Sequence, residues 1–129
     1  MKIRIYYEDT DCGNVVYYAN YLRYFERART EYLREKGLDL EAFHKEGTVF
    51  VVAEVNCQYR KSAHYNDVIN VDTKIVDLTS VTMVFENTVT NQHNEMLTVG
   101  TTKLVCVSAE NGRAIRIPKG FMDVLKRCI

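Results

Sequence analysis

The sequence predicts an α+β fold in which one long helix is followed by an antiparallel sheet. Three observations carry this prediction. Apolar residues recur every three or four positions between residues 18 and 32, which is the spacing of one helix face. After residue 50 the pattern changes to alternation of apolar and polar residues, which is typical of strands with one buried face. Consecutive strands after a single helix favour an α+β arrangement over a parallel sheet.

The first part of the chain predicts a strand, a loop and the long helix. Residues 2–7 are rich in Ile and Tyr and predict a short strand, and residues 9–14 have the composition of a loop. On the polar side of the helix, Arg27 and Glu31 have the spacing of an i,i+4 ion pair. The expected apolar face consists of Tyr18, Tyr21, Leu22, Phe25, Ala28 and Tyr32.

A second, shorter helix is expected directly afterwards. Gly37 suits the C-cap of the long helix. Asp39 suits the N-cap of a helix that runs through His44 and closes at Gly47.

The remainder of the chain predicts a meander of antiparallel strands. Asn111-Gly112 is a strong hairpin signal, with a return expected over residues 114–117, and Pro118 allows a short final helix. One face of the sheet should be covered by the long helix, and the other should meet water or a second subunit. The alternating segments are residues 53–59, 69–75, 81–85 and about 96–107.

Composition limits the function classes. The length of 129 residues suits one domain over residues 1–129. Seventeen basic residues balance seventeen acidic ones, so no overall field attracts nucleic acid. No apolar run is long enough for a membrane span, and the start lacks the apolar core of a signal peptide, so we expect a cytoplasmic protein. The four cysteines form no CxxC pair and the histidines lack metal-ligand spacing, so we expect reduced thiols and no metal.

Four blocks of sequence resemble a known family. The first and most specific is Tyr-Glu-Asp-Thr-Asp-Cys-Gly-Asn-Val-Val-Tyr-Tyr-Ala-Asn-Tyr at residues 7–21, and the others are residues 25–31, 59–67 and 117–119. In order and spacing they resemble the 4-hydroxybenzoyl-CoA thioesterase family of hotdog proteins. They are most similar to the branch of small bacterial acyl-CoA thioesterases associated with the Tol-Pal system.

The resemblance implies a hotdog fold, in which a curled antiparallel sheet wraps around the long helix. It also implies dimers formed by edge-to-edge pairing of sheets, usually paired again into tetramers, with the active site at the dimer interface. The implied reaction is hydrolysis of acyl-CoA thioesters without metal or cofactor. The catalytic carboxylate corresponds to Asp11, and the backbone N–H that polarises the thioester carbonyl corresponds to that of Tyr18. Gly13, Val16 and Asn20 are candidate substrate contacts. Gly13 lies before the helix, where glycine lets the backbone take a sharp turn and approach the substrate closely.

The residues at this site fit that chemistry. Asp11 can attack the carbonyl directly to form a mixed anhydride, or it can take a proton from water, and the sequence leaves both routes open. Unpaired N–H groups at a helix N-terminus suit an oxyanion. In the Tol-Pal branch the position of Tyr18 is commonly histidine, but the backbone donor survives this difference. We expect Asp9 to hold the loop by hydrogen bonds, whereas Asn20 could bind substrate or bond within the first helical turn.

CoA carries phosphates and needs local cations. Two clusters are candidates, one formed by Arg60, Lys61 and His64 and the other by Arg113, Arg116 and Lys119. Lys61 and Lys119 are preferred because they lie in the blocks that resemble the family.

Two other functions compete with the thioesterase. A non-catalytic hotdog module could hold an acyl carrier or a partner protein, but it would not need the Asp11 carboxylate. A hotdog hydratase would need a histidine near the central helix, and none lies between Asp11 and Lys36. The acyl group, and the choice between CoA and acyl-carrier protein, stay open.

Overall fold

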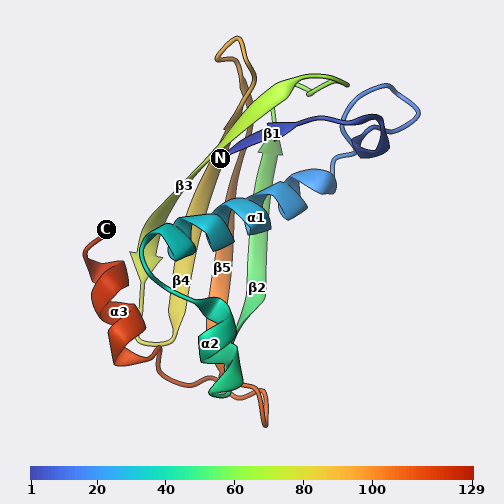
Figure 1. Cartoon of the computed structure of the whole chain (residues 1–129). Helices are drawn as coiled ribbons and strands as arrows, with labels where there is room; N and C mark the ends of the chain where they lie inside the picture. Colours follow the sequence, from blue (N-terminus) through green and yellow to red (C-terminus); the bar gives the residue numbers. More distant parts are fainter.

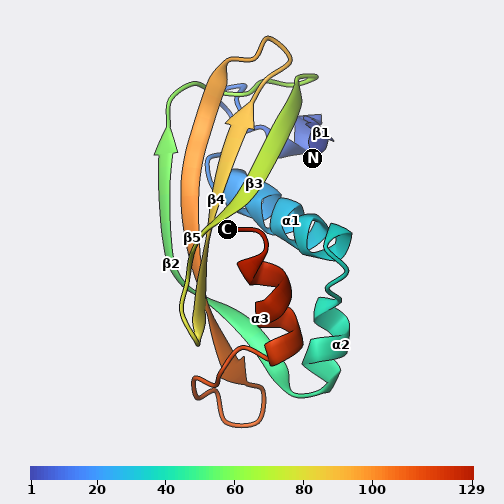
Figure 2. The same cartoon turned by 90° about the vertical axis from the view of Figure 1, so that its left-hand side faces the viewer.

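The computed structural model describes all residues, 1–129. A five-stranded antiparallel sheet forms one layer, and three α-helices lie on one side of it (Figures 1 and 2). The predicted α+β class and curled sheet are therefore confirmed. The elements are β1 (Lys2–Arg4), η1 (Tyr7–Asp9), α1 (Asn20–Glu35), α2 (Leu40–Lys45), β2 (Thr48–Tyr59), β3 (Val68–Leu78), β4 (Thr82–Thr90), β5 (Met96–Ser108) and α3 (Lys119–Lys126).

The strand order in the sheet is β1-β3-β4-β5-β2. Strands β3, β4 and β5 form the expected meander, but β2 pairs with β5 and not with its successor β3. The prediction of a simple meander is wrong at this point, because β1 takes the free side of β3. Residues 60–67 therefore cross between the two sides of the sheet, and β2 is left as a long edge strand.

Helix α1 lies across the concave face of the sheet and supplies much of the core (Figure 2). Its Phe25 ring packs on Gly100 of β5, where an added Cβ would come within 2.4 Å of the ring. Only glycine fits this contact without movement. Around it, Tyr21, Tyr24, Phe25 and Ala28 pack against Ile5, Val16, Ala63, Ile69, Val71, Val89 and Leu97.

The buried stripe of α1 differs from the predicted one. Tyr21, Phe25 and Ala28 are buried as expected, but Leu22 is exposed. Three helix residues outside the predicted apolar face are also buried, namely Tyr24, Arg29 and Leu33. The expected pair between Arg27 and Glu31 is also replaced, because Glu31 pairs with Arg34 one turn further on. The buried face of α1 is therefore rotated from the face that the apolar residues predict, because the helix packs on a twisted sheet.

Several local predictions are confirmed. Helix α2 is capped by Asp39, whose carboxylate accepts hydrogen bonds from the N–H groups of Glu41 and Ala42 at 3.0 and 3.3 Å. Gly37 and Gly47 end the two helices with φ values of 85° and 89°. The short C-terminal helix is α3.

Two of the expected strands, the first and the last in the chain, are shortened or missing. The first strand stops at Arg4, and residues 7–9 form a turn of 3₁₀ helix instead. After the turn at Gly112 (φ 71°), the chain makes a single bridge between Val107 and Ala114 and no return strand.

The face of β2 that the sequence marks as buried is open in the single chain. Cys57 packs against the core, but Val55 and Tyr59 are 40% and 46% exposed. The predicted face of β2 does point toward the core, but most of its side chains are not buried in the single chain. An edge strand has only one neighbouring strand, and here the core under the sheet is centred on β3, β4 and β5.

None of the helices has the length and apolar character needed to cross a membrane.

Candidate functional site

The loop that carries Asp11 is a tight turn fixed to the rest of the chain. The Asp11 N–H donates to the Val15 carbonyl at 2.9 Å, and the Asn14 N–H donates to the Asp11 carbonyl at 3.1 Å. Asn14 has φ 64°, so the left-handed position of the turn is held by asparagine, which tolerates it. The Val16 N–H then donates to the Ala63 carbonyl at 2.9 Å. These bonds hold the loop at a defined place beyond the edge of the sheet (Figure 1).

The Asp11 carboxylate is half-buried and only partly engaged. Its Oδ1 accepts a hydrogen bond from the Gly13 N–H at 2.7 Å, whereas Oδ2 accepts none within the chain. A Cβ at position 13 would lie 3.2 Å from Oδ1. Gly13 therefore leaves room beside the carboxylate, and the sharp turn predicted for it falls on Asn14 instead. One free, ionisable oxygen is the form that a nucleophile or general base requires.

The N–H of Tyr18 is free at the start of α1. Residue 18 lies two positions before Asn20, the first residue of the helix, and Ala19 is its N-cap. The Tyr17 N–H donates to the Asp9 carbonyl at 2.9 Å, but no backbone acceptor receives the N–H of Tyr18. The Tyr18 side chain is 61% exposed. The Tyr18 N–H is therefore unpaired within the chain, and its role toward a substrate stays a prediction.

Asp9 and Asn20 stabilise this entry to the helix. The Asp9 carboxylate accepts from the Tyr6 N–H at 2.8 Å, which confirms its structural role. The Asn20 side-chain amide donates to the Asp9 carbonyl at 3.0 Å, so it ties α1 to the preceding turn. Val16 is only 4% exposed and belongs to the core. Substrate contacts of Asn20 and Val16 stay predictions.

Two tyrosine rings pack against the side chain of Tyr18. The rings of Tyr17 and Tyr18 lie 4.9 Å apart, and those of Tyr18 and Tyr59 lie 6.1 Å apart in a T-shaped contact. The Tyr59 hydroxyl also donates to the Tyr18 carbonyl at 3.0 Å. A hydrogen bond to Tyr18, and more weakly the nearby Asp11 charge, raise the pKa of Tyr17. Sequence reasoning did not assign Tyr59 to the site, because it lies 41 positions from Tyr18.

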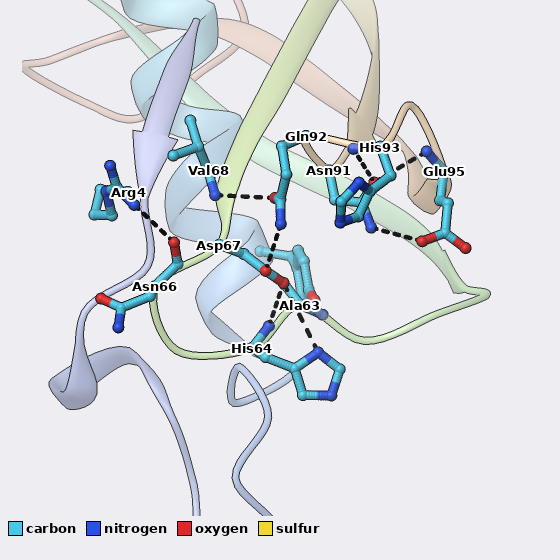
Figure 3. Close-up of polar contacts among 11 residues, drawn as sticks. Arg4, Ala63, His64, Asn66, Asp67, Val68, Asn91, Gln92, His93 and Glu95 are labelled. Carbon is cyan, nitrogen blue, oxygen red and sulfur yellow. Dashed lines mark hydrogen bonds and ion pairs between the residues drawn. The ribbon is translucent and has the colours of Figure 1, made fainter.

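Lys61 belongs to a polar network beside the Asp11 loop. It pairs with Glu95. Nearby, His64 Nδ1 lies 3.8 Å from Asp67 Oδ2, as Figure 3 shows. Burial opposes ionisation of Asp67, but hydrogen bonds from Gln92 and the His64 N–H outweigh it and lower the pKa of the carboxyl. The hollow at this place is lined by Val15, Lys61, Ser62, His64, Asp67, Asn91, His93, Glu95 and Leu97.

Lys119 lies at the other end of the molecule. It is the first residue of α3, in a separate hollow with Arg116 and Lys126 at the foot of the sheet in Figure 1. Lys61 follows the opposite end of β2, a strand that spans roughly 40 Å at about 3.3 Å per residue. The structure therefore does not bring the two preferred lysines together in one chain.

The cysteines are isolated thiols. Cys12 beside Asp11 is exposed, Cys57 is half-buried and Cys106 is buried. No group of three or more His, Cys, Asp and Glu side chains is gathered as metal ligands would be.

Comparisons with known proteins agree with this architecture. Residues 6–125 match the thioesterase-like superfamily. The chain is 34% identical over 125 residues to the acyl-CoA thioester hydrolase YbgC of Escherichia coli O6:H1, which covers 97% of this chain and 93% of the relative. It is 37% identical over 118 residues to the acyl-CoA thioesterase YbgC of Haemophilus influenzae, covering 91% and 86%.

A solved structure shows the same fold. The DHNA-CoA thioesterase of Staphylococcus aureus superposes with a TM-score of 0.95 at 26% identity, over 98% of this chain and 87% of that one. The family match and the fold agree, and the chain belongs to the thioesterase-like superfamily of hotdog proteins.

Proposed function

We propose that this protein hydrolyses acyl-CoA thioesters to a free acid and CoA. The observation that carries the proposal is the pairing of a free carboxylate oxygen on Asp11 with a free N–H on Tyr18 in one short, well-tethered segment. One group can deliver oxygen to a carbonyl carbon, and the other can receive the developing negative charge. Relatives along nearly the whole chain are named acyl-CoA thioester hydrolases.

Two routes use the same groups. Asp11 as general base takes a proton from water, the water oxygen bonds to the carbonyl carbon, and collapse of the oxyanion expels the CoA thiolate, which then takes up a proton. Asp11 as nucleophile expels the thiolate first and forms a mixed anhydride, which water then cleaves. In both routes the carbonyl oxygen accepts from the Tyr18 N–H. Single turnover in ¹⁸O water separates them, because only the anhydride route can leave label in the Asp11 carboxylate.

The proposed site is completed by a second copy of the chain. Strand β2 has an unpaired edge, and its Val51, Val52 and Val55 are 42%, 54% and 40% exposed. A long apolar edge of this kind pairs with another strand unless it is protected. We propose that two β2 edges pair antiparallel into a dimer, and that dimers pair again into a tetramer.

The proposed dimer would also reduce the separation between the two preferred lysines. Antiparallel pairing places the residue-59 end of one β2 beside the residue-48 end of the other. Lys61 of one copy and Lys119 of the second copy then come closer along the strand direction than they do in one chain. We keep both as candidate contacts for the CoA phosphates, in a protein acting in the cytoplasm.

The direct test is release of free thiol from a panel of short, long and aromatic acyl-CoAs and from acyl-carrier thioesters. Saturable release from CoA esters supports the proposal and identifies the acyl class. Release from acyl-carrier thioesters alone would change the substrate class, and no release from either would leave a binding module.

A further inference from the structure

We propose that Tyr59 is a positioning residue that fixes the orientation of residue 18, whose N–H is presented to the substrate carbonyl. Tyr59 ends β2 and lies far in sequence from the Asp11 loop. Its hydroxyl donates to the Tyr18 carbonyl at 3.0 Å. This inference rests on the proposed function, since it concerns the geometry of the Tyr18 N–H.

The Tyr18 carbonyl has no donor from the backbone. In a regular α-helix it would accept from the N–H four residues later. Here the Leu22 N–H donates to the Ala19 carbonyl at 3.2 Å, so the Tyr18 carbonyl is left outside the helical ladder. The Tyr59 hydroxyl supplies the missing donor from across the site.

The bond from Tyr59 completes a two-sided clamp on residue 18. On the preceding side, the Tyr17 carbonyl accepts from the Asn20 N–H at 2.9 Å. In a trans peptide the N–H points opposite to the carbonyl, so this bond turns the Tyr18 N–H outward. On the following side, Tyr59 fixes the carbonyl of Tyr18 itself. Preorganised donors of this kind need no rearrangement when the oxyanion forms.

The Tyr59 ring packs against a second tyrosine that is anchored by its own hydrogen bond. The ring of Tyr59 lies 5.6 Å from that of Tyr21, whose hydroxyl accepts from the Ala63 N–H at 3.2 Å. Burial, followed by the Cys57 thiol, raises the pKa of Tyr59, which further favours the protonated hydroxyl that donates to Tyr18. Because Tyr59 belongs to the edge strand of the proposed dimer, the same residue connects subunit pairing with the geometry of the site.

The test is Tyr59→Phe, which removes the hydroxyl and keeps the ring. We expect kcat to fall about tenfold with KM changed less than about twofold, because the lost effect is on transition-state geometry. Tyr65→Phe is the matched control. Tyr65 is exposed and its ring packs beside that of the exposed Tyr7, so we expect wild-type kcat. A merely structural role would lower the melting temperature without this split between kcat and KM.

A double variant separates the hydrogen bond to the Tyr18 carbonyl from the packing of the Tyr18 and Tyr59 rings. In a Tyr18→Ala background the carbonyl is still present, so Tyr59→Phe should again lower kcat about tenfold. The ¹³C carbonyl resonance of residue 18 should move in Tyr59→Phe and stay in Tyr65→Phe. An unmoved resonance, or wild-type kcat in Tyr59→Phe, would overturn the clamp while leaving the thioesterase intact. Wild-type protein that hydrolyses no thioester would refute the proposed function, and the clamp's catalytic role with it.

Discussion

At residue 18 the proposed chemistry uses the backbone and not the side chain. The side chain is largely exposed, and the N–H beside it has no acceptor in the chain. A histidine, a tyrosine or an alanine can present the same donor, so the identity of the side chain should matter for substrate range more than for reaction type.

The first prediction compares two changes at this residue. Tyr18→Ala keeps the N–H, and we expect turnover within about tenfold of wild type. Tyr18→Pro removes the N–H, and we expect kcat to fall by about 10²–10³ as for loss of an oxyanion donor. Thiol-release kinetics measure both, with circular dichroism to confirm folding. Equal activity of the two variants would remove the N–H from the mechanism.

Sequence motifs located part of this site and missed the rest for a physical reason. Asp11 and the Tyr18 N–H lie seven positions apart in one local block, so a motif contains both. The contact of Tyr59 with Tyr18 depends on how β2 is placed beside the loop, and no local pattern encodes this. Likewise, Lys61 and Lys119 are equally plausible cations in sequence, and only the fold shows that one chain separates them.

At the scale of elements, two contacts fix the site's surroundings. Helix α1 is seated on β5 through Phe25 and Gly100. The crossing from β2 to β3 is tied to the turn after β4 through Asp67 and Gln92, whose amide donates to the carboxylate at 2.9 Å.

Gly100→Ala tests the seating of α1. The added methyl would lie 2.4 Å from Phe25 Cε2 and 3.1 Å from the Asn56 carbonyl, so the helix or the ring must move. We expect a loss of about 1–3 kcal/mol in the free energy of unfolding, measured with denaturant. Gly120→Ala in α3 is the control, since nothing lies within 4 Å of its added methyl. Equal stability of both variants would show that α1 does not approach β5 this closely.

Asp67→Asn tests the tie through its pH dependence. The folded pKa of Asp67 lies below the unfolded value, so its ionised form stabilises the protein above about pH 4, and this stabilisation is lost as pH falls through the folded pKa. We expect the variant to melt below wild type at pH 7, with the gap closing under acid conditions. The exposed Asp77→Asn serves as control. A gap independent of pH would mean that the charge is not the stabilising feature.

Element types were largely predictable because helix and strand periods are local properties. The position of β2 at the edge was not, since alternation shows which side chains share a face but not which strands are neighbours. The same limit explains why its inward face was expected to be buried.

At the scale of the whole molecule, the proposed dimer rests on the exposed edge of β2. Strand β2 and the loop that precedes α1 lie on the same side of the molecule (Figure 1). Subunit pairing would therefore bury the edge and enclose the site in one step.

Val52→Lys tests this coupling. Val52 is 54% exposed in the chain, so a lysine costs the fold little, but in the dimer it would place a charge at the pairing edge. We expect sedimentation to shift toward monomer and turnover to fall in parallel. Val76→Lys on β3, 42% exposed, should stay at least dimeric. A fully active monomer would refute the interface site.

Asp11 is the residue that we propose to perform the chemistry, and thiol release by Asp11→Asn tests this role most directly. Asn keeps the shape and one acceptor but cannot act as nucleophile or base, so we expect turnover to fall at least about 100-fold with fold and oligomer unchanged. Asp123→Asn, an exposed change on α3, should match wild type. Turnover near the wild-type rate in Asp11→Asn would contradict the account.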